Sequence, residues 1–301
     1  MLFIAPFNSC NFNKSEENIL ELIKFSQMEN AFITNMLVKK ISTGVVADVE
    51  DQLAVEEPLE IQLEYGTQGS RIRKNISVTM RTPGNDEELA AGFLFTEGII
   101  GSRREIESVK QAGNNTVVVS LPESNLINLP KTERNFYTTS SCGVCGKTSI
   151  DAIKTVSIYN KVPDDISFKA ELLYTLHDTL KNKQEIFDLT GGLHASALFD
   201  TNGNFMMLRE DVGRHNALDK LIGTSLLNDQ LPLNNSILLL SGRASFELIQ
   251  KACMAGIKIV TAVGAPSSLA VELAEECGIT LIGFLRNERF NIYTGDQRIV
   301  L

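Results

Sequence analysis

The sequence predicts an α/β protein in which a β-rich N-terminal part precedes a layered α/β domain. Between about residues 45 and 121, apolar residues alternate with polar ones, which is the pattern of half-buried strands. From about residue 167 onwards, short apolar runs alternate with segments of helical periodicity, which is typical of parallel strands covered by helices. The chain has 301 residues, 43% of them hydrophobic, which is enough for one large domain or two of ordinary size.

The N-terminal half divides into an appendage and the β-rich part. Residues 1–40 look like an N-terminal appendage that contains one short amphipathic helix. The β-rich part is expected over residues 41–140. Within it, Leu59–Leu63 and Ile76–Met80 alternate as strands do. Asn85–Glu88 then opens a helix, and its first residue is the expected N-cap.

The C-terminal α/β domain is expected over residues 149–301. Its strands are expected at residues 195–199, 205–208, 237–240, 257–262 and 280–285, and its helices at 167–183, 214–222, 247–255 and 267–277. Gly256 and Gly278 stand where two of these helices end, because glycine readily adopts the left-handed conformation that closes a helix.

The charge and cysteine usage exclude several classes of protein. The net charge is −9, which argues against nucleic-acid binding and against binding to an anionic membrane. No apolar run is long enough to cross a bilayer. Five cysteines are too few, and odd in number, for a secreted disulfide scaffold. We therefore expect a soluble cytoplasmic protein.

A short loop over residues 141–148 carries Cys142 and Cys145 between serines and glycines, with Lys147 beside them. Such surroundings favour an accessible thiolate, the reactive form of cysteine. A zinc site needs about four ligands, and no second paired spacing supplies them. A thioredoxin-like pair would follow an apolar strand, which is absent before this loop. A mobile sulfur carrier that holds a persulfide fits best, while a dithiol oxidoreductase remains the alternative.

Polar or glycine-rich segments follow three consecutive strands of the α/β domain. The first, Arg209–Lys220, contains Arg214 and His215 at a strand-to-helix junction. The others are Ser241–Ser245 and Gly264–Ser268. Helix N-termini bind anions, and α/β sheets bind ligands beyond the carboxyl ends of their strands. We therefore expect the three junctions to share one sheet edge and to bind a phosphorylated ligand.

The last buried strand leads into Phe284, Leu285, Arg286, Asn287, Glu288 and Arg289. In this segment, Arg286 and Arg289 could bind phosphates bidentately, and Phe284 could stack on a flat ring. The spacing of the two arginines by itself is only suggestive, because surface arginines around a turn are common.

In this order, the motifs resemble those of the FdhD family, the sulfurtransferase accessory proteins of formate dehydrogenase. The resemblance covers roughly residues 41–301. The matching stretches are residues 80–84 running into 93–99, then 141–147, 190–199, 209–223, 241–255 and 264–293.

The resemblance implies a function, partners and site residues. A cysteine desulfurase would deliver sulfur as a persulfide to Cys142, with Cys145 as an assisting or alternative carrier. The protein would pass this sulfur to molybdenum in Mo-bis(molybdopterin guanine dinucleotide) before that cofactor enters formate dehydrogenase. The residues expected to bind the cofactor are those from Phe284 to Arg289, with Arg214 and His215 at the neighbouring junction. The resemblance also implies a homodimer and a cytidine deaminase-like fold for the main domain.

That fold raises deamination as a rival activity. A zinc deaminase needs an H-x-E motif and a P-C-x-x-C motif. At the corresponding positions, this chain has His215-Asn216-Ala217, which lacks the glutamate, and Ser241–Ser245, which lacks both cysteines. We therefore expect neither deaminase activity nor a zinc site.

Overall fold

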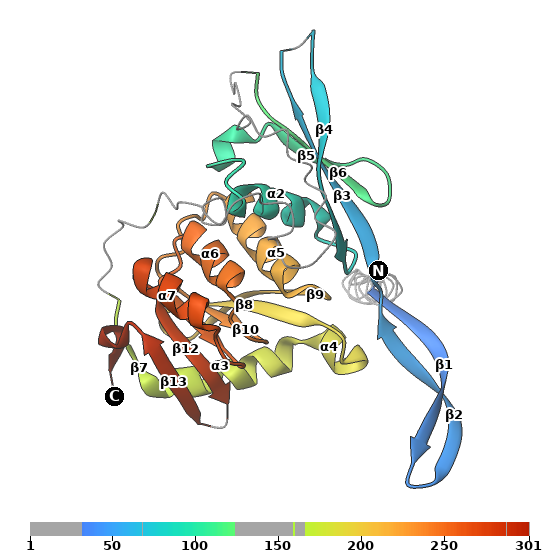
Figure 1. Cartoon of the computed structure of the whole chain (residues 1–301), viewed down its shortest axis with the longest axis vertical. Coiled ribbons are helices and arrows are strands. Elements are labelled where there is room, and N and C mark those ends of the chain that lie inside the picture. Colours follow the sequence, from blue (N-terminus) through green and yellow to red (C-terminus); the bar gives the residue numbers. More distant parts are fainter. Residues whose placement is uncertain (1–31, 68, 124–158, 160–165, 287, 301) are drawn as a thin grey trace, which may run out of the picture.

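A computed structural model describes residues 32–67, 69–123, 159, 166–286 and 288–300 of the chain. Figure 1 shows a layered α/β body, with two-stranded and four-stranded sheets along one side. The architecture is therefore mixed α/β, as the sequence predicts. None of the helices in the described ranges is long and apolar enough to cross a membrane.

The N-terminal part contains a two-stranded and a four-stranded sheet. The two-stranded sheet is an antiparallel hairpin of β1 (Ile33–Ser42) and β2 (Val45–Ala54). The four-stranded sheet has the order β4-β3-β6-β5. Its strands are β3 (Glu57–Tyr65), β4 (Ile72–Arg81), β5 (Ser108–Gln111) and β6 (Thr116–Ser120). The end of the expected appendage at residue 40 therefore falls inside β1. The expected strands at Leu59–Leu63 and Ile76–Met80 are confirmed as parts of β3 and β4.

The helix α2 (Asp86–Thr96) begins where the sequence predicts, but Asn85 does not cap it through its side chain. Asn85 adopts a left-handed conformation with φ 56° and makes no capping hydrogen bond, so that expectation is wrong. The acidic side chain of Asp86 instead receives hydrogen bonds from the Arg81 guanidinium at 2.9 Å on each carboxylate oxygen. This bidentate pair fixes the turn between β4 and α2.

The C-terminal part contains a six-stranded sheet of order β13-β12-β11-β10-β8-β9. Its strands are β8 (His194–Asp200), β9 (Phe205–Asp211), β10 (Ser236–Leu240), β11 (Ile259–Ala262), β12 (Thr280–Arg286) and β13 (Arg289–Thr294). Two short strands, β7 (Phe168–Lys169) and β14 (Ile299–Val300), pair with each other outside this sheet. Only β10, β11 and β12 pair in parallel within this sheet; β8, β9 and β13 pair antiparallel with their neighbours. The sequence predicts the parallel centre but not these antiparallel flanks.

Helices cover both faces of this sheet. They are α3 (Ala170–Lys183), α4 (Glu185–Thr190), α5 (Arg214–Leu227), α6 (Phe246–Met254) and α7 (Ser268–Glu276), with single 3-10 turns at Arg103–Glu105 and Asp296–Arg298. Leu238 and Leu240 pack into the core with α5, α6 and α7, whereas Ile237 and Leu239 pack into the core with α3. Because both faces are covered, β10 is a continuous apolar run and does not alternate.

The β-rich part and the α/β domain share one core. Apolar side chains of β3, α2 and α5 belong to the same buried cluster, as Ile61, Leu89 and Leu218 show. Buried charges connect the same layers: the Lys251 ammonium on α6 lies 2.8 Å from the Asp219 carboxylate on α5 and donates to the Thr96 hydroxyl on α2 at 2.9 Å. The two parts predicted from the sequence are therefore joined by packing and by a buried ion pair.

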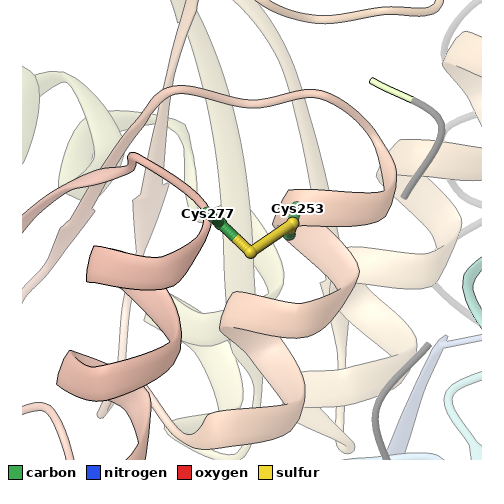
Figure 2. Close-up of a disulfide and its surroundings, with 2 residues drawn as sticks. All are labelled: Cys253 and Cys277. Atoms are coloured by element: carbon green, nitrogen blue, oxygen red, sulfur yellow. A yellow bond between two sulfur atoms is a disulfide. The ribbon is translucent and has the colours of Figure 1, made fainter. Parts of the chain in front are cut away.

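A disulfide between Cys253 and Cys277 joins the C-terminal ends of α6 and α7 (Figure 2). The two Cα atoms lie 6.3 Å apart, and both residues are buried. The sequence did not predict this bond, because the two cysteines are separated by 24 positions and meet only when the two helices pack together. Gly256 and Gly278 follow these helix ends with φ 76° and 64°, as expected for residues that close helices.

Candidate functional site

The carboxyl ends of four strands meet at one edge of the six-stranded sheet. β10, β11 and β12 run in parallel, and β9 runs the same way because it is antiparallel to β8, which is antiparallel to β10. The three junctions that follow β9, β10 and β11 therefore share this edge, as the sequence predicts. We call it the functional edge. His194, the first residue of the antiparallel strand β8, lies at the same edge.

Backbone hydrogen bonds hold the loops of the functional edge together. The Gly264 N–H donates to the Gly242 carbonyl at 2.9 Å, and the Ser267 N–H donates to the Ala244 carbonyl at 3.0 Å. The Phe284 N–H donates to the Gly264 carbonyl at 3.1 Å. The loops after β10 and β11 and the end of β12 thus form a single surface.

Two glycines allow these loops to approach closely. A Cβ atom at Gly264 would lie 3.0 Å from the Gly242 carbonyl oxygen, and one at Gly242 would lie 3.3 Å from Nδ1 of His194. Side chains at either position would push the loops or the imidazole away. Glycine here serves close backbone approach, the use that a ligand-binding loop often makes of it.

His215 and Glu247 form a polar pair at the start of α5 and α6. The Nε2 atom of His215 lies 3.1 Å from the Glu247 carboxylate, which also accepts from the Ser245 hydroxyl at 3.3 Å. Burial acts to raise the pKa of Glu247, but the hydrogen bond and positive charge of His215 outweigh it and hold that pKa below its usual value. Glu247 is therefore ionised and orients the His215 ring.

Two buried nitrogen atoms at this edge keep unused hydrogen-bonding capacity. Within the described ranges, neither Nδ1 of His215 nor Nε of Arg214 has a hydrogen-bond partner. Buried polar atoms are normally paired, so an unpaired one indicates a ligand or water that completes it. Nearby, burial lowers the pKa of His194, and the charges of Arg214 and His215 add to this effect. A neutral imidazole at His194 can both accept and donate a hydrogen bond.

A cavity of about 490 Å³ opens beside His194. The side chains of Leu180, Phe187, Leu193 and Val263 supply apolar surface, and His177, Gln184, His194 and Ser241 supply polar groups. The Ser241 hydroxyl is held in place because it accepts from the Ala195 N–H at 2.8 Å. Cavities of this size and mixture are typical of small-molecule sites.

Glu210 lies on β9, against α4 and close to this cavity. Its carboxylate accepts a hydrogen bond from the Phe187 N–H at 3.2 Å. Burial raises the pKa of Glu210 to about 7, although the backbone N–H groups of Phe187 and Ile186 and the Gln184 side chain act in the opposite direction. The nearby Glu185 carboxylate adds to the increase.

We expect the free energy of unfolding to fall as the pH rises from 4.5 to about 7, the window between the usual and the raised pKa of Glu210. In this window the folded protein binds more protons than the unfolded chain, so raising the pH favours unfolding. Because Glu210 is partly exposed, the loss is on the order of 1 kcal/mol. Urea unfolding of Glu210→Gln should lack this loss. The control Glu171→Gln should retain it, because Glu171 is exposed on α3 and does not contribute to the raised pKa of Glu210. Equal pH dependence of Glu210→Gln and the unmodified protein would contradict the assignment.

The model of the FdhD/NarQ family matches residues 54–300, which is most of the chain. The chain belongs to the FdhD/NarQ family. Among its relatives, a protein of Streptomyces avermitilis is 48% identical over 275 residues, covering 88% of this chain and 94% of that protein. A protein of Saccharolobus solfataricus is 42% identical over 267 residues, covering 87% and 98% respectively. Both relatives are named "Sulfur carrier protein FdhD".

A solved structure shows that the fold is shared as well. The crystal structure of a candidate formate dehydrogenase accessory protein from Desulfotalea psychrophila matches with a TM-score of 0.69. It covers 89% of this FdhD/NarQ chain and all of its own, at 24% sequence identity. At that identity the likeness concerns the fold alone. The closer likeness to cytidine deaminases stays a prediction.

The structure places only some of the predicted site residues of this FdhD/NarQ protein. Arg214 and His215 lie together at the functional edge, near His194. Cys142, Cys145 and Asn287 fall outside the described residues, so their expected roles stay predictions. No group of three or more His, Cys, Asp or Glu side chains is placed to hold a metal ion in the described ranges.

The predicted cofactor segment surrounds the turn between β12 and β13. Arg286 and Arg289 are directly opposite each other across this turn, and both are exposed. Glu288 between them is exposed and has φ 56°. Phe284 is half-buried, with φ 57°. Leu285, by contrast, is only 1% exposed and packs in the core with α3. Its side chain therefore anchors the segment to the core and is not available to a ligand.

Sequence reasoning included Ser241 in a predicted junction but missed Glu247 and the cavity beside His194. Glu247 is an acidic residue in the first turn of a helix, where such residues are common for reasons of helix stability alone. Its role as the partner of His215 depends on the packing of α6 against α5. The sequence carries one signal for the cavity, a pair of glycines followed by a histidine at Gly191-Gly192-Leu193-His194, since all four of these residues line it.

Proposed function

We propose that this chain is a sulfur carrier that serves formate dehydrogenase. Cys142 accepts sulfur as a persulfide from a cysteine desulfurase and passes it to Mo-bis(molybdopterin guanine dinucleotide), which is the substrate of the transfer. Membership of the FdhD/NarQ family and the names of the relatives support the sulfur-carrier role. The observation that carries the cofactor part is the functional edge, with its unpaired nitrogen atoms on Arg214 and His215.

The chemistry of the functional edge suits an anionic, flat ligand. Arg214 supplies positive charge, and Arg243 in the loop after β10 is exposed. α5, α6 and α7 all begin at this edge, and their N-terminal N–H groups favour phosphate. The neighbouring cavity has both apolar walls and hydrogen-bonding side chains, so it can receive a ring system.

The transfer begins at Cys142 in the proposed mechanism. Its thiolate attacks the terminal sulfur of the desulfurase persulfide, the old S–S bond breaks, and the desulfurase cysteine leaves as a thiolate. Cys142 then holds a persulfide. In release, Cys145 attacks the inner sulfur of Cys142, so that a Cys142–Cys145 disulfide forms and the terminal sulfur departs as sulfide to the metal. A later dithiol reductant restores the pair.

The remaining elements of the proposal follow from the family resemblance. The protein works in the cytoplasm, as a homodimer, with a cysteine desulfurase and formate dehydrogenase as partners. A second candidate function is a chaperone that binds the cofactor without transferring sulfur. The functional edge favours this candidate equally, since it concerns binding alone, and the two candidates differ only at Cys142.

Mass spectrometry after incubation with cysteine and a cysteine desulfurase tests the sulfur-carrier function. We expect the peptide that contains Cys142 and Cys145 to gain the mass of one sulfur atom, and a thiol reductant to remove it. The Cys142→Ala variant should not gain this labile sulfur. The peptides of Cys253 and Cys277 serve as internal controls, because their sulfur atoms are joined in the disulfide. An unmodified Cys142 peptide would reject the carrier and leave the chaperone.

A further inference from the structure

The N-terminus of α5 differs from those of the other two helices that begin at the functional edge. At α7, the Ser267 hydroxyl accepts from the Ala270 N–H at 3.3 Å, and at α6 the Glu247 carboxylate lies in the first turn. Among the described residues, α5 has no side-chain cap and no acidic residue in its first turn, because its N-cap is Gly213. The first N–H groups of a helix have no partner within the helix, so those of α5 stay free for an anion.

A second observation points to a ligand at this N-terminus. His215, in the first turn of α5, is only 8% exposed, and its Nδ1 atom has no hydrogen-bond partner within the described ranges. The Nε atom of the preceding Arg214 is unpaired in the same ranges. Buried polar atoms are normally paired, and a helix N-terminus favours negative charge. An anionic group bound here would complete both.

Asp211 holds this N-terminus in place without occupying it. Asp211 is 0% exposed and lies two residues before the N-cap. One of its carboxylate oxygens accepts from the Gly213 N–H at 2.8 Å and from the Asn216 side chain at 3.1 Å. The other lies 2.7 Å from the Lys220 ammonium. None of these contacts uses a backbone N–H of the first turn of α5.

The Asp211 carboxylate is ionised in this position. Burial raises the pKa of Asp211, and the charge and hydrogen bond of Lys220 act in the opposite direction. The groups of Gly213, Asn216 and Lys220 that face the carboxylate are all donors, and only an ionised carboxylate is purely an acceptor. The Lys220 charge compensates that of Asp211, so the pair does not repel an anion at the functional edge.

The same carboxylate ties α5 to the turn between β4 and α2. The Thr82 N–H donates to Asp211 at 3.2 Å, and the Val212 N–H donates to the Thr82 hydroxyl at 3.1 Å. The Lys220 ammonium donates to the Thr82 carbonyl at 2.8 Å. Thr82 is 2% exposed, and all three of its polar groups take part in these contacts. The turn therefore supports the N-terminus of α5 from behind.

Glycine at the N-cap keeps these contacts close. A Cβ atom at Gly213 would lie 3.0 Å from Nδ2 of Asn216 and 3.4 Å from Oδ1 of Asp211. The Asn216 side chain also donates to the Met80 carbonyl at 2.7 Å, so it has little freedom to move away. Serine, threonine or aspartate, the usual N-caps, would press on Asn216 here and would also compete with an anion for the free N–H groups.

We propose that Asp211 is the positioning residue of the ligand site at the functional edge, and that Thr82 acts with it. The two residues hold the N-terminus of α5 uncapped, so that its N–H groups, Arg214 and His215 meet an anionic ligand together. Asp211 acts through α5 and does not touch the ligand. The inference rests on the ligand binding of the proposed function, and it is independent of sulfur transfer.

Binding of guanosine diphosphate to the full chain, measured together with urea unfolding, tests the role of Asp211. We expect Asp211→Asn to bind the nucleotide about tenfold more weakly, because contacts to charged groups are worth about that factor. Asp219→Asn is the matched control. Asp219 is also on α5, is 1% exposed and lies 2.8 Å from a buried lysine, Lys251, but it does not contact the N-terminus of the helix.

Both variants break a buried ion pair, so both should lose stability. Only Asp211→Asn should lose affinity for the nucleotide. An equal loss of affinity in Asp211→Asn and Asp219→Asn would show that Asp211 is merely structural, and unchanged affinity in Asp211→Asn would overturn the proposal as well.

Thr82 supplies a milder pair of variants, which tests the proposal even where Asp211→Asn does not fold. Thr82→Val removes the hydroxyl that accepts from the Val212 N–H, whereas Thr82→Ser keeps it. We expect Thr82→Val to bind guanosine diphosphate more weakly and Thr82→Ser to bind it as the unmodified protein does. Equal affinities of the two variants would contradict the proposal.

Histidine NMR distinguishes a failure of this inference from a failure of the proposed function. The chain has three histidines. His194 reports on the site, because burial and then the charges of Arg214 and His215 lower its pKa. In Thr82→Val without nucleotide, the pKa of His194 should rise toward its ordinary value, since those charges are no longer held beside it; in Thr82→Ser it should not. An unchanged pKa in Thr82→Val would overturn the inference. If the unmodified protein does not bind the nucleotide, the cofactor part of the proposed function fails, and the NMR titration alone decides the positioning role.

Discussion

Alanine in place of Gly92 or Gly223 is expected to lower the free energy of unfolding by more than about 3 kcal/mol. Gly92 is on α2 and Gly223 on α5, where the two helices cross in backbone contact. A Cβ at Gly92 would overlap the Asp219 carbonyl oxygen, and one at Gly223 would overlap the Glu88 carbonyl oxygen. Neither obstacle is a side chain that can rotate away, so the helices must separate.

The sign of this prediction is informative because local helix propensity acts in the opposite direction. Alanine in a helix interior is favoured over glycine by about 1 kcal/mol, so a net loss must come from the crossing of the helices. Chemical unfolding of both variants measures the effect. Gly69→Ala is the control, since a Cβ there meets nothing within 4 Å. Stabilities of Gly92→Ala and Gly223→Ala close to that of the control would show that the helices can separate without cost.

Replacing Cys142 with alanine is expected to abolish activation of formate dehydrogenase while leaving the fold intact. The substitution removes the sulfur atom that carries the persulfide in the proposed mechanism, and no other thiol in the loop takes the first attack. Formate dehydrogenase activity in cells that carry only the variant measures the loss. Cys10→Ala is a matched control, because it removes a thiol outside the loop.

Guanine nucleotide binding separates the carrier from a chaperone in the same experiment. Cys142→Ala should bind a guanine nucleotide as the unmodified protein does, because the functional edge is untouched. The exposed pair Arg286→Ala with Arg289→Ala should show the reverse, with the loop thiols intact and nucleotide binding lost. Full enzyme activation by Cys142→Ala would show that the protein acts as a chaperone without sulfur transfer.

The local sequence pattern was sufficient to predict most helices and strands of the C-terminal domain. The apolar runs at residues 237–240 and 280–285 are confirmed as strands β10 and β12, and helix ends at Gly256 and Gly278 are confirmed by their positive φ. Such signals work because strand burial and helix closure depend on a few neighbouring residues. β2 lies within the range expected to be β-rich, but β1 escaped prediction because its apolar residues do not alternate cleanly with polar ones.

Side-chain contacts that the local pattern does not show explain the errors in the candidate site and around it. Asn85 has the composition of an N-cap, but the bidentate contact between Arg81 and Asp86 sets the local turn. Leu285 belongs to a motif that suggested ligand binding, yet its side chain fills the core beside α3. In both cases a residue type is compatible with two roles, and only its neighbours in space decide between them.

The sequence by itself determined the α/β class, the order of the main elements, and the loop in which Cys142 and Cys145 stand three positions apart. These features are local: periodicity, glycine at helix ends and the spacing of two thiols. Only the tertiary structure decided that β8 and β13 pair antiparallel with the parallel centre of the sheet, that Glu247 orients His215, and that Cys253 meets Cys277. Each of these depends on how separate helices and strands pack, because packing brings together groups that no local pattern relates.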